Sequence, residues 1–155
     1  MCIRDRRRVL LDLTGLPDLP GLPEDADGTL DHVIEFALNS PHYGEHWGRH
    51  WLDVARWAES NGHQHNRHRP HAWRYRDYVV TAFQNHLPFN AFVEQQLAGD
   101  LLEGNGALVA TGFLAAARYS GNELDKATQR NDILVDVANT TARAFLGLTL
   151  SLIHI

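Results

Sequence analysis

Two histidines spaced four residues apart, His46 and His50, are the first residues of this chain whose type and spacing suggest chemistry. In a helix, side chains at i and i+4 project to the same side, so the two imidazoles can chelate one metal ion. Asp53, one turn further on, can supply an oxygen ligand. Zinc proteases of the His-Glu-x-x-His type need Glu directly after the first His, and Trp47 stands there. The spacing therefore allows a metal site but not the protease motif.

A structural role for the stripe formed by His46, His50 and Asp53 is favoured over a metal site. Asp53 has Arg49 four residues before it and Arg56 three residues after it, so it can pair with either. His50 can be a polar residue at the edge of the core, and no Cys lies nearby to support a metal site. A second arc of this predicted helix is apolar and is expected to be its buried face. This arc comprises Tyr43, Trp47, Trp51, Val54, Ala55 and Ala58.

Residues 60–71 form a polar segment rich in His and Arg. Such a segment can bind an anion, coordinate a metal or dock an acidic partner. The alternative is a solvated loop whose arginines pair with Glu59 and Asp77. Arg69 and Arg76 are the stronger anion ligands, because a fixed guanidinium can bind a carboxylate or a propionate through two hydrogen bonds.

We group these residues into one candidate functional cluster. It comprises His46, His50, Asp53, Arg56, Glu59, His63, Arg69, Trp73, Arg76 and Asp77. Trp57, Arg69 and Trp73, if exposed, can contact a sugar or a partner protein. We recognise no Ser-His-Asp arrangement, phosphate-binding glycine loop or paired carboxylates, so the sequence predicts no reaction and leaves open whether the chain is an enzyme.

The spacing of apolar residues predicts an all-α fold, an irregular multi-helix domain with long loops. Ser40 and Pro41 are typical of an N-cap followed by the first helical position. Three Pro between residues 17 and 28 predict a loop there. The predicted helices are Arg7–Leu13, Leu30–Leu38, Pro41–Glu59, His71–Leu87, Asn90 to about Gly104, Ala107–Arg118 and Glu123–Leu150.

The composition fits one mildly acidic domain. The chain has 155 residues, with 19 Asp and Glu against 14 Lys and Arg, and a net charge of −5. This charge argues against nucleic acid as a partner. No apolar run reaches the roughly 20 residues that a membrane-spanning helix needs, so no transmembrane segment is expected.

The two ends are expected to be foreign to the protein. Residues 1–6 and 150–155 correspond to complementary DNA strings that resemble the transposon end used to fragment DNA for sequencing. Such segments are excluded from fold reasoning. We therefore expect a native domain over residues 7–149 that is truncated at both ends.

Several motifs together resemble the planctomycete cytochrome-associated domain of unknown function, number fifteen-forty-nine, the second planctomycete cytochrome module. The longest is Ser40–Arg56, SPHYGEHWGRHWLDVAR. The others are Arg8–Pro17, Asn61-Gly62, Arg69-Pro70, Ala72–Asp77, Pro88-Phe89 with Phe92, Gln96–Leu102, Thr111–Phe113 and Phe145–Thr149. The chain departs from the family at His63, where an aromatic residue is usual, and at residues 64–66, where acidic residues are expected.

The resemblance implies a part of a large exported protein, periplasmic or at the cell surface. Its partners would be the neighbouring cytochrome-type and C-terminal domains of the same polypeptide. In the family a Cys-x-x-Cys-His element, the attachment signature of haem c, follows the match at Gly147–Thr149. This chain lacks that element, so we expect no cofactor here and haem c in the full-length protein.

Three functions are therefore considered. The leading hypothesis is a non-catalytic helical module of an exported, haem-associated protein. The second is a metal-dependent hydrolase or polysaccharide-active protein that uses His46, His50 and Asp53. The third is a scaffold module that binds carbohydrate or protein.

Overall fold

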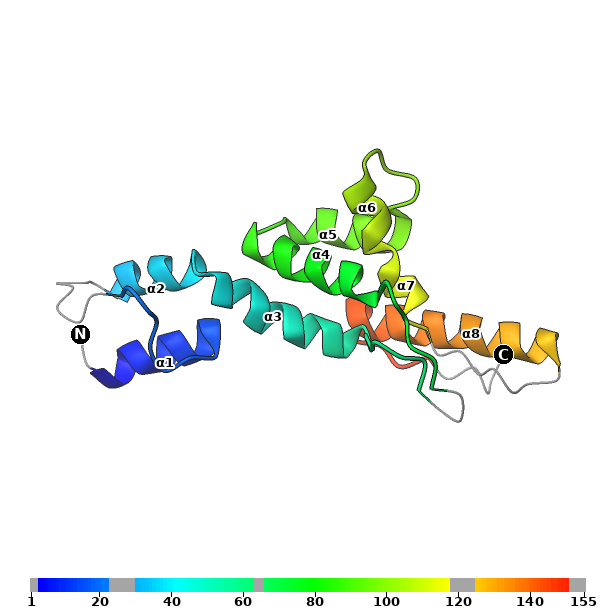
Figure 1. Cartoon of the computed structure of the whole chain (residues 1–155), viewed down its shortest axis with the longest axis horizontal. Helices are drawn as coiled ribbons and strands as arrows, with labels where there is room; N and C mark the ends of the chain where they lie inside the picture. The colour runs from blue at the N-terminus through cyan, green and yellow to red at the C-terminus, as the bar shows by residue number, and fades with distance from the viewer. Residues whose placement is uncertain (1–2, 23–29, 63–65, 118–124, 151–155) are drawn as a thin grey trace. The chain divides into compact units, whose positions relative to one another are not determined.

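The computed structural model describes residues 3–22, 30–62, 66–117 and 125–150, and its regular structure is helical (Figure 1). The elements are α1 (Ile3–Thr14), α2 (Leu30–Leu38), α3 (Pro41–Val54), α4 (Ala72–Gln84), α5 (Phe89–Ala98), α6 (Asn105–Ala110), α7 (Gly112–Ala115), α8 (Lys126–Thr141) and the π-helix η1 (Ala142–Leu146). One isolated antiparallel bridge joins Ser60 to His68. The predicted all-α class is confirmed. Within the described ranges, no helix is both long enough and apolar enough to span a bilayer.

The chain divides into two compact units. Unit 1 comprises Met1–Trp51 and Val79–Pro88, and unit 2 comprises Leu52–Tyr78 and Phe89–Ile155. Helices α3 and α4 each contribute residues to both units.

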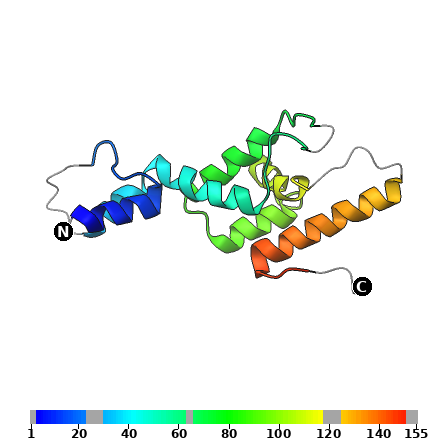
Figure 2. The ribbon, with the colours of Figure 1, turned by 90° about the horizontal axis from the view of Figure 1, so that it is seen from below.

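The core of unit 1 is aliphatic. Helices α1 and α2 lie side by side in both ribbon views (Figures 1 and 2). The buried residues of this core are Leu10, Leu19, Leu22, Val33 and Ala37. Leu19 and Leu22 belong to the segment after α1 that its prolines predicted as a loop, so this loop also supplies part of the core.

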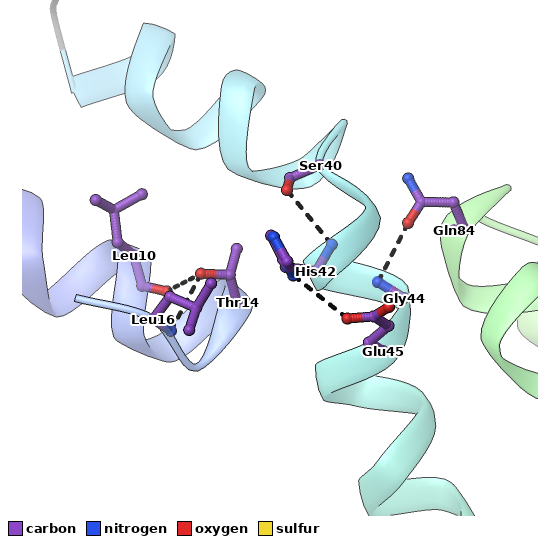
Figure 3. A network of polar contacts seen from close by, with 8 residues as sticks. All are labelled: Leu10, Thr14, Leu16, Ser40, His42, Gly44, Glu45 and Gln84. Carbon is purple, nitrogen blue, oxygen red and sulfur yellow. Dashed lines mark hydrogen bonds and ion pairs between the residues drawn. The ribbon is translucent and has the colours of Figure 1, made fainter. Parts of the chain in front are cut away.

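The start of α3 follows the predicted capping chemistry. Figure 3 shows the Ser40 Oγ accepting a hydrogen bond from the backbone N–H of His42 at 3.4 Å, with Pro41 at the first helical position. An N-cap side chain of this kind satisfies one of the donors left unpaired at a helix start. One turn into the helix, His42 Nδ1 lies 3.3 Å from Glu45 Oε2.

The face of α3 that meets α4 contains Gly44 and Gly48 and not the predicted aromatic arc. A Cβ on Gly44 would lie 2.7 Å from the Val80 carbonyl oxygen, and one on Gly48 would lie 3.3 Å from Val80 Cγ2. The Gly44 N–H also donates to Gln84 Oε1 at 3.3 Å (Figure 3). Because glycines let two helix backbones approach closely, α4 packs on this face. The prediction that the whole arc is buried is therefore wrong, and Trp47 remains 36% exposed.

Helix α3 ends at Val54, five residues before the predicted end. Arg56 adopts a left-handed backbone conformation with φ of 56°. The Trp57 N–H donates to the Leu52 carbonyl at 2.9 Å, and the Arg56 N–H donates to the Asp53 carbonyl at 3.2 Å. This pair of bonds is the Schellman arrangement that closes many helices, usually around a glycine. Trp57 therefore lies beyond the end of α3, although the sequence predicted a helix as far as Glu59.

The C-terminal helices also differ from their predicted bounds. The single helix predicted over Ala107–Arg118 is interrupted at Thr111, between α6 and α7. Helix α8 begins after Asp125, whose carboxylate accepts hydrogen bonds from the next turn, and the π-helix that follows ends at Gly147 with φ of 65°. Leu134 on α8 is 57% exposed.

Candidate functional site

The His- and Arg-rich segment folds back on itself in unit 2. Ser60 and His68 pair as an antiparallel bridge, and the Arg69 N–H donates to the Glu59 carbonyl at 2.7 Å. The described part of the segment is therefore fixed by backbone hydrogen bonds and is not simply a solvated loop. His63 of the candidate cluster lies outside the described residues.

Arg69 links this segment to the end of α7. Its Nε donates to Asn61 Oδ1 at 2.5 Å, and its Nη2 donates to the Ala117 carbonyl at 3.0 Å. Carbonyl groups just beyond a helix end lack intrahelical partners, and a basic side chain can satisfy them. Arg69 was predicted as an anion ligand. In the structure its hydrogen bonds hold the described part of residues 60–71 against the end of α7.

Trp57 lies beside a small cluster of charges. Its Nε1 donates to the Ala72 carbonyl at 2.9 Å, and the Arg76 guanidinium lies 5.9 Å from its ring centre. Arg76 also pairs with Asp77 at 2.9 Å and with Glu59 at 3.6 Å. The two carboxylates therefore pair with Arg76 of α4, whereas the solvated-loop interpretation assigned them to the arginines of residues 60–71. Pairs this exposed contribute about 0–1 kcal/mol each.

These segments surround a cleft of about 520 Å³, within the range of small-molecule sites. All of its lining residues belong to unit 2. The apolar and aromatic lining residues are Trp57, Ala58, Pro70, Ala72, Tyr75, Leu108, Val109, Ala115 and Ala116. The other lining residues are His68, Arg69, His71, Arg74, Thr111 and Gly112, so within the described part of the chain no Asp or Glu lines this cleft.

Tyr75 and Gly112 form a wall that the sequence analysis missed. Tyr75 is 4% exposed, and its hydroxyl donates to Gln96 Oε1 at 2.7 Å. A Cβ on Gly112 would lie 2.8 Å from the Tyr75 ring, so α7 can approach the ring only with glycine at this position. The family motif Thr111–Phe113 contains this glycine, but its chemistry gave no reason to assign it to a site.

Tyr78 lies next to this wall and remains protonated near neutral pH. Its hydroxyl donates to Gln95 Oε1 at 2.8 Å, and its ring stacks on Phe92 with 6.3 Å between ring centres. Burial raises the pKa of Tyr78 to about 12. A phenol with this pKa is a poor general base at physiological pH.

The two histidines of the predicted metal stripe do meet. The rings of His46 and His50 lie edge to face with 4.9 Å between centres. A Cβ on Gly15 would lie 2.7 Å from His46 Nδ1, so this imidazole also packs against the end of α1. Among the residues that the structure describes, no three His, Cys, Asp or Glu side chains are grouped so as to hold a metal ion. The metal site stays a prediction.

The remaining candidates have other neighbours. Arg56 forms an ion pair with Asp136 of α8, rather than pairing with Asp53. Arg74 lies over the Trp73 ring at 5.6 Å, and Trp73 is 47% exposed. Asp77 pairs with Arg76, the residue before it, and not with Arg74 three residues before it on the same helix.

The fold and the site define an all-helical domain with a cationic, largely apolar cleft. The family model PSCyt2, described as "Protein of unknown function (DUF1549)", matches residues 5–151, and the chain belongs to this family. The resemblance deduced from the motifs is confirmed. No curated protein and no solved structure matches the chain.

Proposed function

We propose that the chain is a non-catalytic helical module of an exported protein associated with c-type cytochrome, and that it binds a ligand in the unit 2 cleft. Family membership supports the first part. The cleft supports the second, and it is the observation on which binding depends. The neighbouring cytochrome-type and C-terminal domains would be its partners within one polypeptide.

The cleft suits binding because its walls are fixed before a ligand arrives. Arg69 is held by two side-chain hydrogen bonds, Trp57 by one, and Tyr75 by its bond to Gln96. A site that is already ordered loses less conformational entropy when it binds.

Binding is tested with a neutral apolar dye, N-phenyl-1-naphthylamine, titrated into the whole chain. We expect a saturable rise in dye fluorescence with one site per chain. Ala115→Phe places a ring in the cleft and should abolish this binding, whereas Ala127→Phe, an exposed position on α8 outside the cleft lining, should retain it. Absence of saturable binding, or equal binding by the two variants, would refute the proposed binding function.

The cytochrome association is tested separately on the gene extended downstream and expressed with cytochrome c maturation. We expect covalent haem and a Soret band from a Cys-x-x-Cys-His element beyond the Gly147–Thr149 match. An extended reading frame without that element, or a product without Soret absorbance, would contradict this part of the proposal.

A second candidate function is a metal-dependent hydrolase or polysaccharide-active protein, favoured by the contact between His46 and His50. Zinc titrated into the chain should then bind stoichiometrically, and His46→Ala or His50→Ala should abolish binding. His42→Ala is the control, because His42 pairs with Glu45 instead. Failure of the unsubstituted chain to bind zinc would remove this candidate.

A further inference from the structure

We infer that the unit 2 cleft takes a small organic anion, a molecule with a flat apolar body and one carboxylate or sulfonate group at its edge. This inference rests on the proposed binding function, since it concerns the same cleft. It goes further by assigning the chemical class of the ligand and the arginine that would meet its charge.

The distribution of charge supports an anion. The chain carries 19 acidic against 14 basic residues, yet among the described residues the cleft is lined by two arginines and two histidines and by no carboxylate. A cleft with low-dielectric walls concentrates the field of the charges that line it. The guanidinium groups should therefore make the electrostatic potential in this cleft positive, although the chain as a whole has a net negative charge.

Arg74 is the group that would meet the anion. Arg69 also lines the cleft, but its Nε and Nη2 already donate to Asn61 and to the Ala117 carbonyl. Arg74 is exposed, and the Trp73 ring beneath its guanidinium, 5.6 Å away, restricts its orientation. An arginine held in this way loses less side-chain entropy when it binds a carboxylate.

The walls require an apolar body on the same ligand. An inorganic ion would leave the surfaces of Trp57, Leu108 and Val109 in contact with water. A cavity of about 520 Å³ matches a drug-sized molecule, which favours a small amphiphilic acid over an isolated ion. A neutral sugar carries no negative charge that the cationic lining residues could pair with, so this lining would not favour it.

The test compares two dyes that share an apolar body. 8-Anilino-1-naphthalenesulfonate carries a sulfonate, and N-phenyl-1-naphthylamine is its neutral counterpart. We expect the whole chain to bind the sulfonate more tightly than the neutral dye, by about twofold to fivefold at low salt, the upper part of the range expected for one exposed ion pair. The preference should decrease as salt screens the charges.

Substitutions locate the charge. Arg74→Gln should remove the preference for the sulfonate over the neutral dye, whereas Arg74→Lys should retain most of this preference. Arg130→Gln on α8 is the matched control, because it makes the same change of charge outside the cleft lining. Far-ultraviolet circular dichroism checks that each variant keeps its helices.

The outcomes separate this inference from the function on which it rests. Equal affinity for the two dyes, or a preference that survives Arg74→Gln, would overturn the inference while the cleft remains a binding site. Saturable binding of neither dye would overturn both.

Discussion

The two units of the chain bury different kinds of side chain. Unit 1 is centred on aliphatic residues, with Leu10, Val33 and Ala37 at 0–1% exposure. Unit 2 buries aromatic and polar groups that bind one another, such as Tyr75 with Gln96, and brings glycines against its walls. The cleft belongs to unit 2. The difference indicates that directional contacts between side chains, rather than aliphatic burial, give this site its shape.

Loss of aliphatic burial should have the largest effect on stability. Leu10→Ala removes a side chain that is 0% exposed, so we expect the free energy of unfolding to fall by about 3 kcal/mol. Leu11→Ala is the matched control. The Leu11 side chain is next to Leu10 in the sequence but is 46% exposed, so its removal should lower the free energy of unfolding by well under half as much. Urea unfolding followed by circular dichroism measures both. Similar losses for the two variants would show that the core of unit 1 is not centred on Leu10.

A methyl group at a tight backbone contact should have the next largest effect. A Cβ on Gly99 would lie 1.9 Å from the Ala107 carbonyl oxygen, so α5 and α6 must separate in Gly99→Ala. We expect a loss of about 2 kcal/mol. Gly106→Ala, within α6 and with open space around it, should instead gain up to about 1 kcal/mol through helix propensity. The reverse order in thermal unfolding would contradict the close contact described for unit 2.

The hydrogen bond between Tyr75 and Gln96 should contribute less. Gln96→Met removes the acceptor at 2.7 Å, but it also removes Nε2, a buried nitrogen that has no partner among the described residues. These effects oppose each other, so we expect a net loss of about 1 kcal/mol. Tyr75→Phe and the double variant complete a cycle in urea unfolding. A coupling energy of zero would show that this bond does not stabilise the cleft wall.

The last effect is confined to alkaline pH. Burial raises the pKa of Tyr78 to about 12, above the unfolded value of about 10. Because the folded state holds this proton more tightly, its contribution to stability is complete below about pH 10 and is lost as the pH rises through about 12. The free energy of unfolding should therefore fall more steeply in this window for the unsubstituted chain than for Tyr78→Phe. Parallel curves would disprove the assignment.

Local patterns predicted much of the fold. The sequence predicted α2 at its observed bounds, Leu30–Leu38, and also the Ser40 cap, because helical periodicity and capping depend on adjacent residues. The end of α3 was missed because Arg56, a non-glycine residue, occupies the left-handed position that closes it. The face of α3 that packs against α4 was missed because such close packing requires glycines, and glycines do not contribute to a pattern of apolar side chains.

The site was predicted only in part. Arg69 and Trp57 were singled out by their chemistry, and both line the cleft. Tyr75 and Gly112 were not, because their role depends on contacts between distant segments, as does the bond from Arg69 to Ala117 across 48 residues. Such pairings cannot be deduced from local spacing.

The glycine face of α3 has a consequence for synthesis of the chain. Gly44 meets Gln84, which follows it by 40 residues. At roughly 5–20 residues per second, a ribosome would deliver the covering segment roughly 2–8 seconds after that face. Glycines weaken an isolated helix by about 1 kcal/mol each, so the nascent segment is expected to remain largely uncoiled during this interval. Helix α3 would thus become stable only after the segment around Gln84 that covers it has been synthesised.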